Sequence, residues 1–261
     1  AKLLNELIDY ASAFEREPIS ASKLIVGMKC GGSDGFSGIT ANPLVGRFSD
    51  LLIGKGGTTI LTEVPEMFGA ETLLMNRCAN RELFDETVSL INDFKQYFKD
   101  NHQTIYENPS PGNKKGGIST LEDKSLGCTQ KSGSAPVCGV LSYGECVKTS
   151  GLNLLSAPGN DLVAATALAA SGAHIVLFTT GRGTPFASPV PTVKISSNST
   201  LAGKKKNWID FNAGVLVEDA ELDTVGQQLF DYVIDVASGR KVCSEEAGFH
   251  DMAIFKQGVT L

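Results

Sequence analysis

The sequence predicts an α/β fold, built as a Rossmann-like, mostly parallel sheet with helices on both faces. Two observations predict it. Short apolar runs rich in β-branched residues recur along the chain, and segments with helical spacing of apolar residues alternate with them. Continuous apolar runs are typical of strands that helices cover on both faces. We therefore expect one α/β domain over residues 1–261.

The first half of the chain opens with a helical pattern over residues 2–14, where apolar residues recur every three or four positions. A buried strand is expected over 23–28, before a glycine-rich loop. Residues 42–55 again have helical spacing, and Pro43 suits a first helical turn. The remaining elements expected here are a strand over 58–64 and helices over 66–77 and 80–100.

The second half begins with a polar stretch over residues 101–117, which is rich in Asn, Pro, Gly and Lys and is expected to be a loop. Apolar, strand-like runs and two more helical patterns follow it. The expected strands cover 137–142, 151–156, 173–179 and 191–196, and the expected helices cover 161–171 and 222–236.

Composition and motifs exclude several classes of protein. The net charge of −6 argues against a nucleic-acid or anionic-membrane partner. No apolar run approaches the roughly 20 residues of a membrane helix. Neither a GxGxxG nor a GK[ST] motif is present, so no nucleotide cofactor is expected. The six cysteines form no CxxC pair and indicate reduced thiols, which favours a cytoplasmic protein.

Polar residues follow the first predicted strand, and sites in parallel sheets form at the carboxyl ends of strands. Cys30 offers a soft metal ligand, Ser33 a hydroxyl and Asp34 a carboxylate, within a loop whose glycines allow a ligand close to the backbone. The alternative is a tight turn whose polar groups bond one another. Glycine spacing alone does not decide between the two.

Two carboxylates, Glu63 and Glu66, stand at and just after the end of the second predicted strand. Glu63 is a candidate metal ligand or base, with a structural role as the alternative. For Glu66 we favour a simpler role, because an acidic residue in a first helical turn is stabilised by the helix dipole.

Two further segments carry groups suited to an anionic substrate. Asn113 and Lys114 lie in a loop that alternates stiff prolines with permissive glycines, and a lysine there can pair with a carboxylate or act as a base. Thr180 and Arg182 follow the strand over 173–179, and an arginine between glycines is placed to bind a carboxylate in a bidentate manner. A solvated loop and an arginine bonded to loop carbonyls are the alternatives.

Several strings go beyond general chemistry, and the chain resembles the altronate/galactarate dehydratase family from about Ser22 to near its C-terminus. The strings are KCGGSDGFSGITANP (29–43), NPSPGNKKGG (108–117), EDKSLG (122–127), FTTGRGTP (178–185) and DFNAG (210–214). TEVPEMFGAE (62–71) looks more like the altronate enzymes than the galactarate enzymes. Family members are longer, so the resemblance implies the C-terminal portion of a longer enzyme.

The resemblance implies a hydro-lyase that dehydrates D-altronate to 2-dehydro-3-deoxy-D-gluconate, with a divalent metal, iron(II), as Lewis acid. It implies a sugar-acid substrate, a homodimer, and partners in the N-terminal and middle segments of the complete enzyme. The isolated portion is then expected to be inactive. Galactarate dehydratase and a non-catalytic sugar-acid-binding module are the alternatives.

The polar strand-end residues supply parts for this chemistry. Cys30 is the expected metal ligand, and Lys114, Glu63 and Asp34 are the expected catalytic residues. Arg182, Ser33, Asn113 and Thr180 are expected to bind the substrate. Cys128 and His174 receive no role, because they match no signature of the family.

Overall fold

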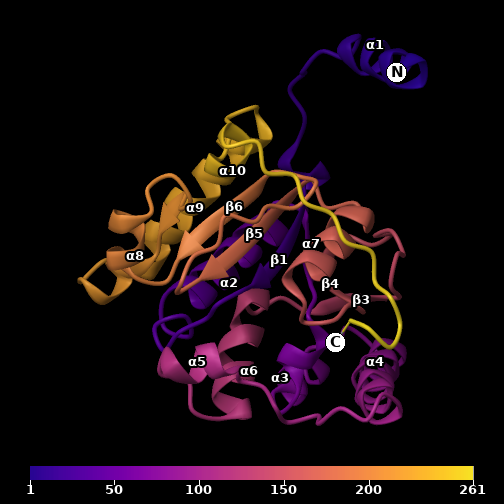
Figure 1. The fold of residues 1–261 in the computed structure, drawn as a ribbon, viewed down its shortest axis with the longest axis vertical. Coiled ribbons are helices and arrows are strands. Elements are labelled where there is room, and N and C mark those ends of the chain that lie inside the picture. Colours follow the sequence, from indigo (N-terminus) through magenta and orange to yellow (C-terminus); the bar gives the residue numbers. More distant parts are fainter. Residues whose placement is uncertain (261) are drawn as a thin grey trace.

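The computed structural model describes residues 1–260 and confirms the predicted fold class. Within these residues, seven strands form one sheet in which every pair of neighbours is parallel (Figure 1). The strands are β1 (Ile25–Cys30), β2 (Thr58–Leu61), β3 (Val137–Leu141), β4 (Gly151–Leu155), β5 (Ile175–Thr180), β6 (Thr192–Ser196) and β7 (Phe211–Asn212). Their order across the sheet is β3-β4-β2-β1-β5-β6-β7.

This order gives the sheet a switch point beside its central strand. The chain passes from β1 to β2 on one side and fills the rest of that side with β3 and β4. It then crosses to the other side of β1 and adds β5, β6 and β7. Ligands of open α/β sheets bind where the strand order reverses, outside the carboxyl ends of the strands. The end of β1 is therefore the first place to look for a site.

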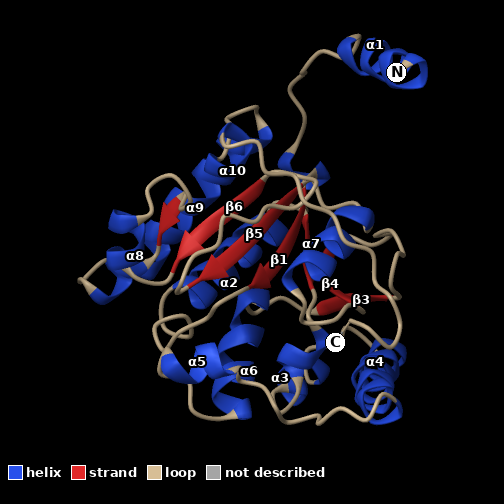
Figure 2. Ribbon diagram, in the orientation of Figure 1, coloured by secondary structure: helices blue, strands red, loops and turns tan. Residues whose placement is uncertain are grey.

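Helices surround the sheet, as Figure 2 shows. The α-helices are α1 (Lys2–Ser12), α2 (Ala41–Gly54), α3 (Glu71–Met75), α4 (Arg81–Asp100), α5 (Pro111–Lys115), α6 (Leu121–Thr129), α7 (Asp161–Ala170), α8 (Ser199–Lys204), α9 (Leu222–Ala237) and α10 (Cys243–Glu246). Short 3₁₀ helices cover Ala21–Lys23, Val64–Met67, Gln130–Ser132 and Gly214–Val217. The helices α3, α5 and α6 lie beyond the ends toward which the central strands point.

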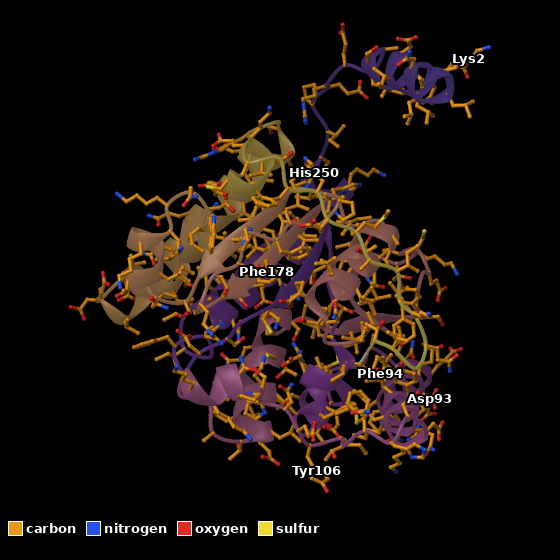
Figure 3. All side chains as sticks on the ribbon, in the orientation of Figure 1. Lys2, Asp93, Phe94, Tyr106, Phe178 and His250 are labelled. Carbon is orange, nitrogen blue, oxygen red and sulfur yellow. The ribbon has the colours of Figure 1, made fainter. Side chains whose placement is uncertain are left out.

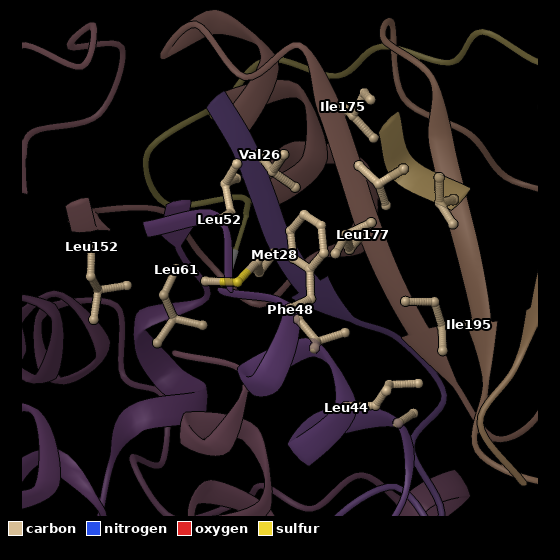
Figure 4. Close-up of a cluster of buried hydrophobic side chains, with 14 of the residues drawn as sticks. Val26, Met28, Leu44, Phe48, Leu52, Leu61, Leu152, Ile175, Leu177 and Ile195 are labelled. Carbon is tan, nitrogen blue, oxygen red and sulfur yellow. The ribbon is translucent and has the colours of Figure 1, made fainter. Parts of the chain in front are cut away.

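The two faces of the sheet bury different apolar clusters, because side chains alternate along a strand. The larger cluster joins the sheet to α2, α4 and α9, and in it Phe48 of α2 lies between Met28 and Leu177 (Figure 4). On the opposite face, Leu168 of α7 packs in a second cluster with Val176. Both faces are therefore covered, as the continuous apolar runs predict.

The structure corrects two of the predicted elements and adds others. The helix expected over 66–77 is a 3₁₀ turn, Val64–Met67, followed by the short α3. Glu63 and Gly69, both with positive φ, interrupt the pattern on either side of this turn. The stretch 101–117 is not wholly a loop, because it contains α5. The helix α6 has no counterpart among the predicted elements.

The first helix stands apart from the sheet and its covering helices (Figure 1). It forms where the apolar spacing predicts it, but all of its residues are exposed, including Leu4 and Leu7. Among the described residues, no helix is both long and apolar enough to cross a membrane.

Two glycines of α2 provide a paired test of this packing. A Cβ on Gly46 would overlap the carbonyl oxygen of Gln130, just past α6, whereas a Cβ on Gly54 would meet nothing within 4 Å. We predict that Gly46→Ala destabilises the protein by about 1–3 kcal/mol, because the backbone at Gln130 or in α2 must move to make room for the methyl group. Gly54→Ala should be neutral or stabilise it by up to about 1 kcal/mol. Urea unfolding measures both, and equal effects would contradict the packing described.

Candidate metal centre and active-site cavity

A lysine side chain is fully buried where β1 ends. Its ammonium, Lys29 Nζ, donates hydrogen bonds to Glu63 Oε1 at 3.0 Å, to Asp161 Oδ1 at 2.6 Å and to the carbonyl oxygen of Cys30 at 2.8 Å. It also lies 4.6 Å from the ring centre of Phe178, which Figure 3 shows near the middle of the molecule. Glu63 follows β2 and Asp161 begins α7, so one ammonium joins two strand ends to a helix start.

The Glu63 carboxylate is also buried, and it holds Cys30 in place. Its Oε2 accepts a hydrogen bond from the Cys30 backbone N–H at 2.8 Å. Its φ of 66° is unusual for a residue other than glycine, and the two bonds of its side chain help to fix this conformation. Glu63 does not line the cavity described below. Its contacts hold the ends of β1 and β2 in position.

Burial and charge act on these two groups in opposite ways. Burial raises the pKa of Glu63 to about 8. The nearby Cys30 sulfur also raises this pKa, whereas Lys29 lowers it. Burial alone would lower the pKa of Lys29, but the carboxylates of Glu63 and Asp161 outweigh it and raise that pKa above its ordinary value. The lysine is therefore held as a buried cation.

Three side chains that could hold a metal ion meet beside this ion pair. Cys30, Glu66 and Cys128 are all buried, and one ligand atom of each lies within 4.8 Å of the others. The Cys30 and Cys128 sulfurs are 3.5 Å apart, and Cys128 Sγ is 3.2 Å from Glu66 Oε2. Two sulfurs and one carboxylate oxygen form a donor set that suits a first-row transition metal. We call these three residues the donor triad.

Local sequence signals explain why α6 brings Cys128 to this place. The Thr120 hydroxyl accepts a hydrogen bond from the Asp123 N–H at 3.1 Å and caps the start of the helix. Lys124 and Cys128 are four residues apart and thus share one face of α6. That face meets the 3₁₀ turn that carries Glu66. Residues from three distant parts of the chain thereby meet at the end of β1.

Lys124 bonds to every member of the triad. Its Nζ lies 2.7 Å from Glu66 Oε2, 3.4 Å from Cys128 Sγ and 3.6 Å from Cys30 Sγ, and its side chain is 4% exposed. The Cys128 hydrogen bond lowers the pKa of Cys30 well below its usual value despite burial, and Lys124 reinforces this. The same bond, with burial, raises the pKa of Cys128. Of the two thiols, Cys30 is therefore the one that loses its proton more readily.

A cavity of about 480 Å³ opens beside the donor triad. Cys30, Glu66 and Lys124 line its inner end, and Asp161 lines its side. The segment that leads into α5 forms another wall, where Ser110 and Asn113 are part of the lining. This volume is within the range of small-molecule sites, roughly 300–1,000 Å³. The cavity joins polar, charged and metal-binding groups at the switch point of the sheet.

The loops after β1, β2 and β5 converge at this end of the sheet, as strand-end placement predicts. Ser33 is buried, its hydroxyl accepts a hydrogen bond from Lys124 Nζ at 3.4 Å, and its carbonyl accepts one from Asn113 Nδ2 at 2.8 Å. Asp34 lies further out, where its carboxylate accepts hydrogen bonds from the side chains of Ser197 and Asn198. Asp34 thus fastens the β1 loop to the loop after β6.

The remaining predicted residues do not line the cavity. Thr180 is buried, and its hydroxyl oxygen accepts a hydrogen bond from the Gly183 N–H at 2.9 Å, which shapes the turn after β5. Arg182 is exposed and lies against Gly112 in α5. Within residues 1–260 its guanidinium makes no ion pair or hydrogen bond. Lys114 is exposed and does not line the cavity.

Sequence reasoning missed four groups of this site. Cys128 received no role, Glu66 was interpreted as a simple first-turn acid, and Lys29 and Lys124 were not considered. The Thr120-x-x-Asp123 pattern is the signal that could have identified the start of α6. His174, which also received no role, accepts a hydrogen bond from the Ile25 N–H near the opposite ends of the strands.

Comparisons with known proteins fit this arrangement. Residues 21–260 match the family model for D-galactarate/altronate dehydratase, C-terminal. The chain is 64% identical over 260 residues to an altronate dehydratase of Bacillus subtilis and 59% identical over 258 residues to one of Escherichia coli, in each case over 99% of this chain and 52% of the relative. A galactarate dehydratase (L-threo-forming) of Escherichia coli is 41% identical over 245 residues, or 92% of this chain and 47% of the relative. The chain thus spans about half the length of these relatives.

The buried ion pair supports a stability prediction. Lys29→Met should destabilise the protein by about 3–5 kcal/mol in urea unfolding, because it leaves the buried Glu63 without its partner. Adding Glu63→Gln should recover part of this loss by removing the buried acid whose partner is gone. Arg81→Met, which breaks an exposed pair with Asp85, is the control and should change little. A Lys29→Met protein as stable as the control would show that the buried pair contributes nothing.

Proposed function

We propose a hydro-lyase function for this chain, which belongs to the D-galactarate/altronate dehydratase family. Its part in the complete enzyme is to supply metal ligands and one side of the sugar-acid pocket. The observation that carries this proposal is the buried donor triad at the inner end of a cavity of about 480 Å³. The higher identity to altronate dehydratases than to the galactarate dehydratase favours D-altronate as substrate, with 2-dehydro-3-deoxy-D-gluconate as product.

The donor triad fits a divalent metal on its own chemistry. Cys30, Glu66 and Cys128 offer three ligand atoms within bonding reach of one ion, and the Lys124 ammonium lies against all three. A position that already attracts the Lys124 ammonium also suits a metal cation. Thiolate and carboxylate ligands together are compatible with iron(II), which we propose as the metal. When bound, such an ion supplies Lewis-acid stabilisation of negative charge that develops on the substrate.

Arg182 is the group best suited to bind the substrate carboxylate. Its guanidinium lies beside α5, whose first residue, Pro111, lines the cavity, and it has no protein partner in residues 1–260. A planar guanidinium binds a carboxylate through two parallel hydrogen bonds, which fixes orientation as well as position. The rigid turn formed by Thr180 holds the arginine's backbone in place. The substrate would then extend inward from Arg182 toward the donor triad.

The reaction also needs a base for the proton on the carbon beside the carboxylate. Asp161 is a suitable candidate, because its carboxylate lines the cavity and one of its oxygens is fixed by the Lys29 ammonium at 2.6 Å. A fixed carboxylate loses little freedom when the substrate binds. The expected bases Glu63, Asp34 and Lys114 are less suited, since the first two bond protein groups and none of the three lines the cavity.

We further propose that segments outside this chain complete the enzyme. The chain covers about half the length of its relatives, and three protein ligands leave positions on a metal open. The cavity wall on the side of α5 is formed by short, exposed segments that another part of the protein would close. On this basis the chain alone binds metal but turns over D-altronate poorly.

Metal binding tests the donor triad directly. We predict that Cys128→Ser lowers iron(II) affinity and dehydratase activity of the complete protein by more than the roughly 10–100-fold typical of outer-shell changes, because a ligand itself is lost. Cys146→Ser is the matched control, since Cys146 is exposed and remote from the triad. Anaerobic metal titration and turnover of D-altronate and galactarate are measured on both variants. Unchanged metal affinity in Cys128→Ser would refute the proposed centre. Faster turnover of galactarate than of D-altronate would show that galactarate is the substrate.

The role of Arg182 leads to a separate kinetic prediction. Arg182→Lys should lower kcat/KM for D-altronate by a factor on the order of 10 or more, because a lysine cannot reproduce the bidentate contact. Arg240→Lys, in an exposed pair with Asp235, serves as the control. If a folded Arg182→Lys enzyme keeps the kinetics of the control, Arg182 does not bind the substrate.

A further inference from the structure

The position of Lys124 conflicts with simultaneous metal binding. Its ammonium lies 2.7–3.6 Å from one atom of each member of the donor triad. The two sulfurs are themselves only 3.5 Å apart, and Glu66 Oε2 is 3.2 Å from one of them. An ion at ordinary bond lengths, roughly 2.0–2.3 Å from each ligand atom, has to sit within this small group. The ammonium and the ion would then be closer than two cations can stay.

We infer that Lys124 is a displaceable counter-cation of the donor triad, which leaves this position when a divalent cation binds and extends into the neighbouring cavity. This inference rests on the proposed metal centre. It assigns to Lys124 a role that the rest of the mechanism does not use, that of keeping the triad charge-balanced and buried until the metal arrives.

Electrostatics explains why a cation is needed there in the absence of metal. Burying a carboxylate beside two sulfurs is costly unless a positive charge compensates it. Lys124 provides this charge at contact distance, and Lys131 lies buried in the same region with its pKa raised by the two cysteines against the effect of burial. A divalent ion brings more charge than one ammonium, so it makes the ammonium unnecessary and repels it.

The structure also shows where the side chain can go. Lys124 lines the cavity of about 480 Å³ on one side and a smaller hollow of about 210 Å³ on the other. Its flexible four-carbon stem lets the ammonium rotate while the backbone of α6 stays in place. In the larger cavity it meets the space proposed for an anionic sugar acid. Metal binding would thus prepare the cavity for the anion, so the metal binds before the substrate.

Measuring metal affinity alone, without turnover, distinguishes a displaceable Lys124 from one that supports or ligates the ion. Anaerobic Co²⁺ titration of the complete protein should show that Lys124→Met binds Co²⁺ at least about tenfold more tightly than the unmodified protein, because the competing charge is gone. Lys115→Met, an exposed change on α5, should bind as the unmodified protein does. Weaker or unchanged affinity in Lys124→Met would overturn the inference, since the lysine would then support or ligate the ion. Equal binding by Cys128→Ser and the unmodified protein would instead refute the metal centre itself.

A second measurement needs no variant and covers the case that Lys124→Met does not fold. Brief labelling of amines, followed by peptide mass mapping, reports the accessibility of each lysine. Lys124 is 4% exposed without metal and should label several-fold faster once Co²⁺ is bound. Lys115 should label at the same rate in both states. Protection of Lys124 that persists in the metal-bound protein would overturn the inference.

Discussion

The site depends on one buried cation, the ammonium of Lys29. It bonds Glu63, Asp161 and the Cys30 carbonyl at once, and so fixes the end of β1 against the end of β2 and the start of α7. Glu63 in turn bonds the Cys30 N–H from a left-handed conformation that would be unfavourable without its partners. The arrangement is costly to bury and strongly coupled, so removing any one group leaves another uncompensated.

On this frame the chain assembles groups from distant parts of its sequence. Cys30 ends β1, Glu66 lies in the turn after β2, and Cys128 comes from α6, more than sixty residues further along the chain. Parallel strands direct the loops to one end of the sheet, and the switch point beside β1 leaves room for a cavity between them. The positive charges of Lys29 and Lys124 make it possible to bury so many acidic and sulfur groups together.

The sequence predicts the sheet well, because buried strands leave continuous apolar runs and the alternating helices leave a clear period. It also points to the right end of the sheet, since Cys30 ends a strand and Glu63 and Arg182 come two residues after theirs. It does not reveal the helix α6, whose apolar spacing is weak and whose inward face carries Lys124 and Cys128. Such a face is chemically indistinguishable from a solvated one until tertiary contacts place it. The structural roles of Glu63 and Asp34 are hidden for the same reason, because a carboxylate that bonds protein and one that meets substrate have the same local sequence.

X-ray absorption at the metal edge of the iron-loaded protein tests most directly whether the strand ends and α6 form a metal centre. The donor triad predicts two sulfur atoms per iron at about 2.3 Å, together with lighter oxygen or nitrogen atoms. The sulfur contribution should fall to one atom when Cys128 is replaced by serine. A first shell made only of oxygen and nitrogen in the unmodified protein would contradict the account, because the two buried cysteines would then be packing residues and the metal would bind elsewhere.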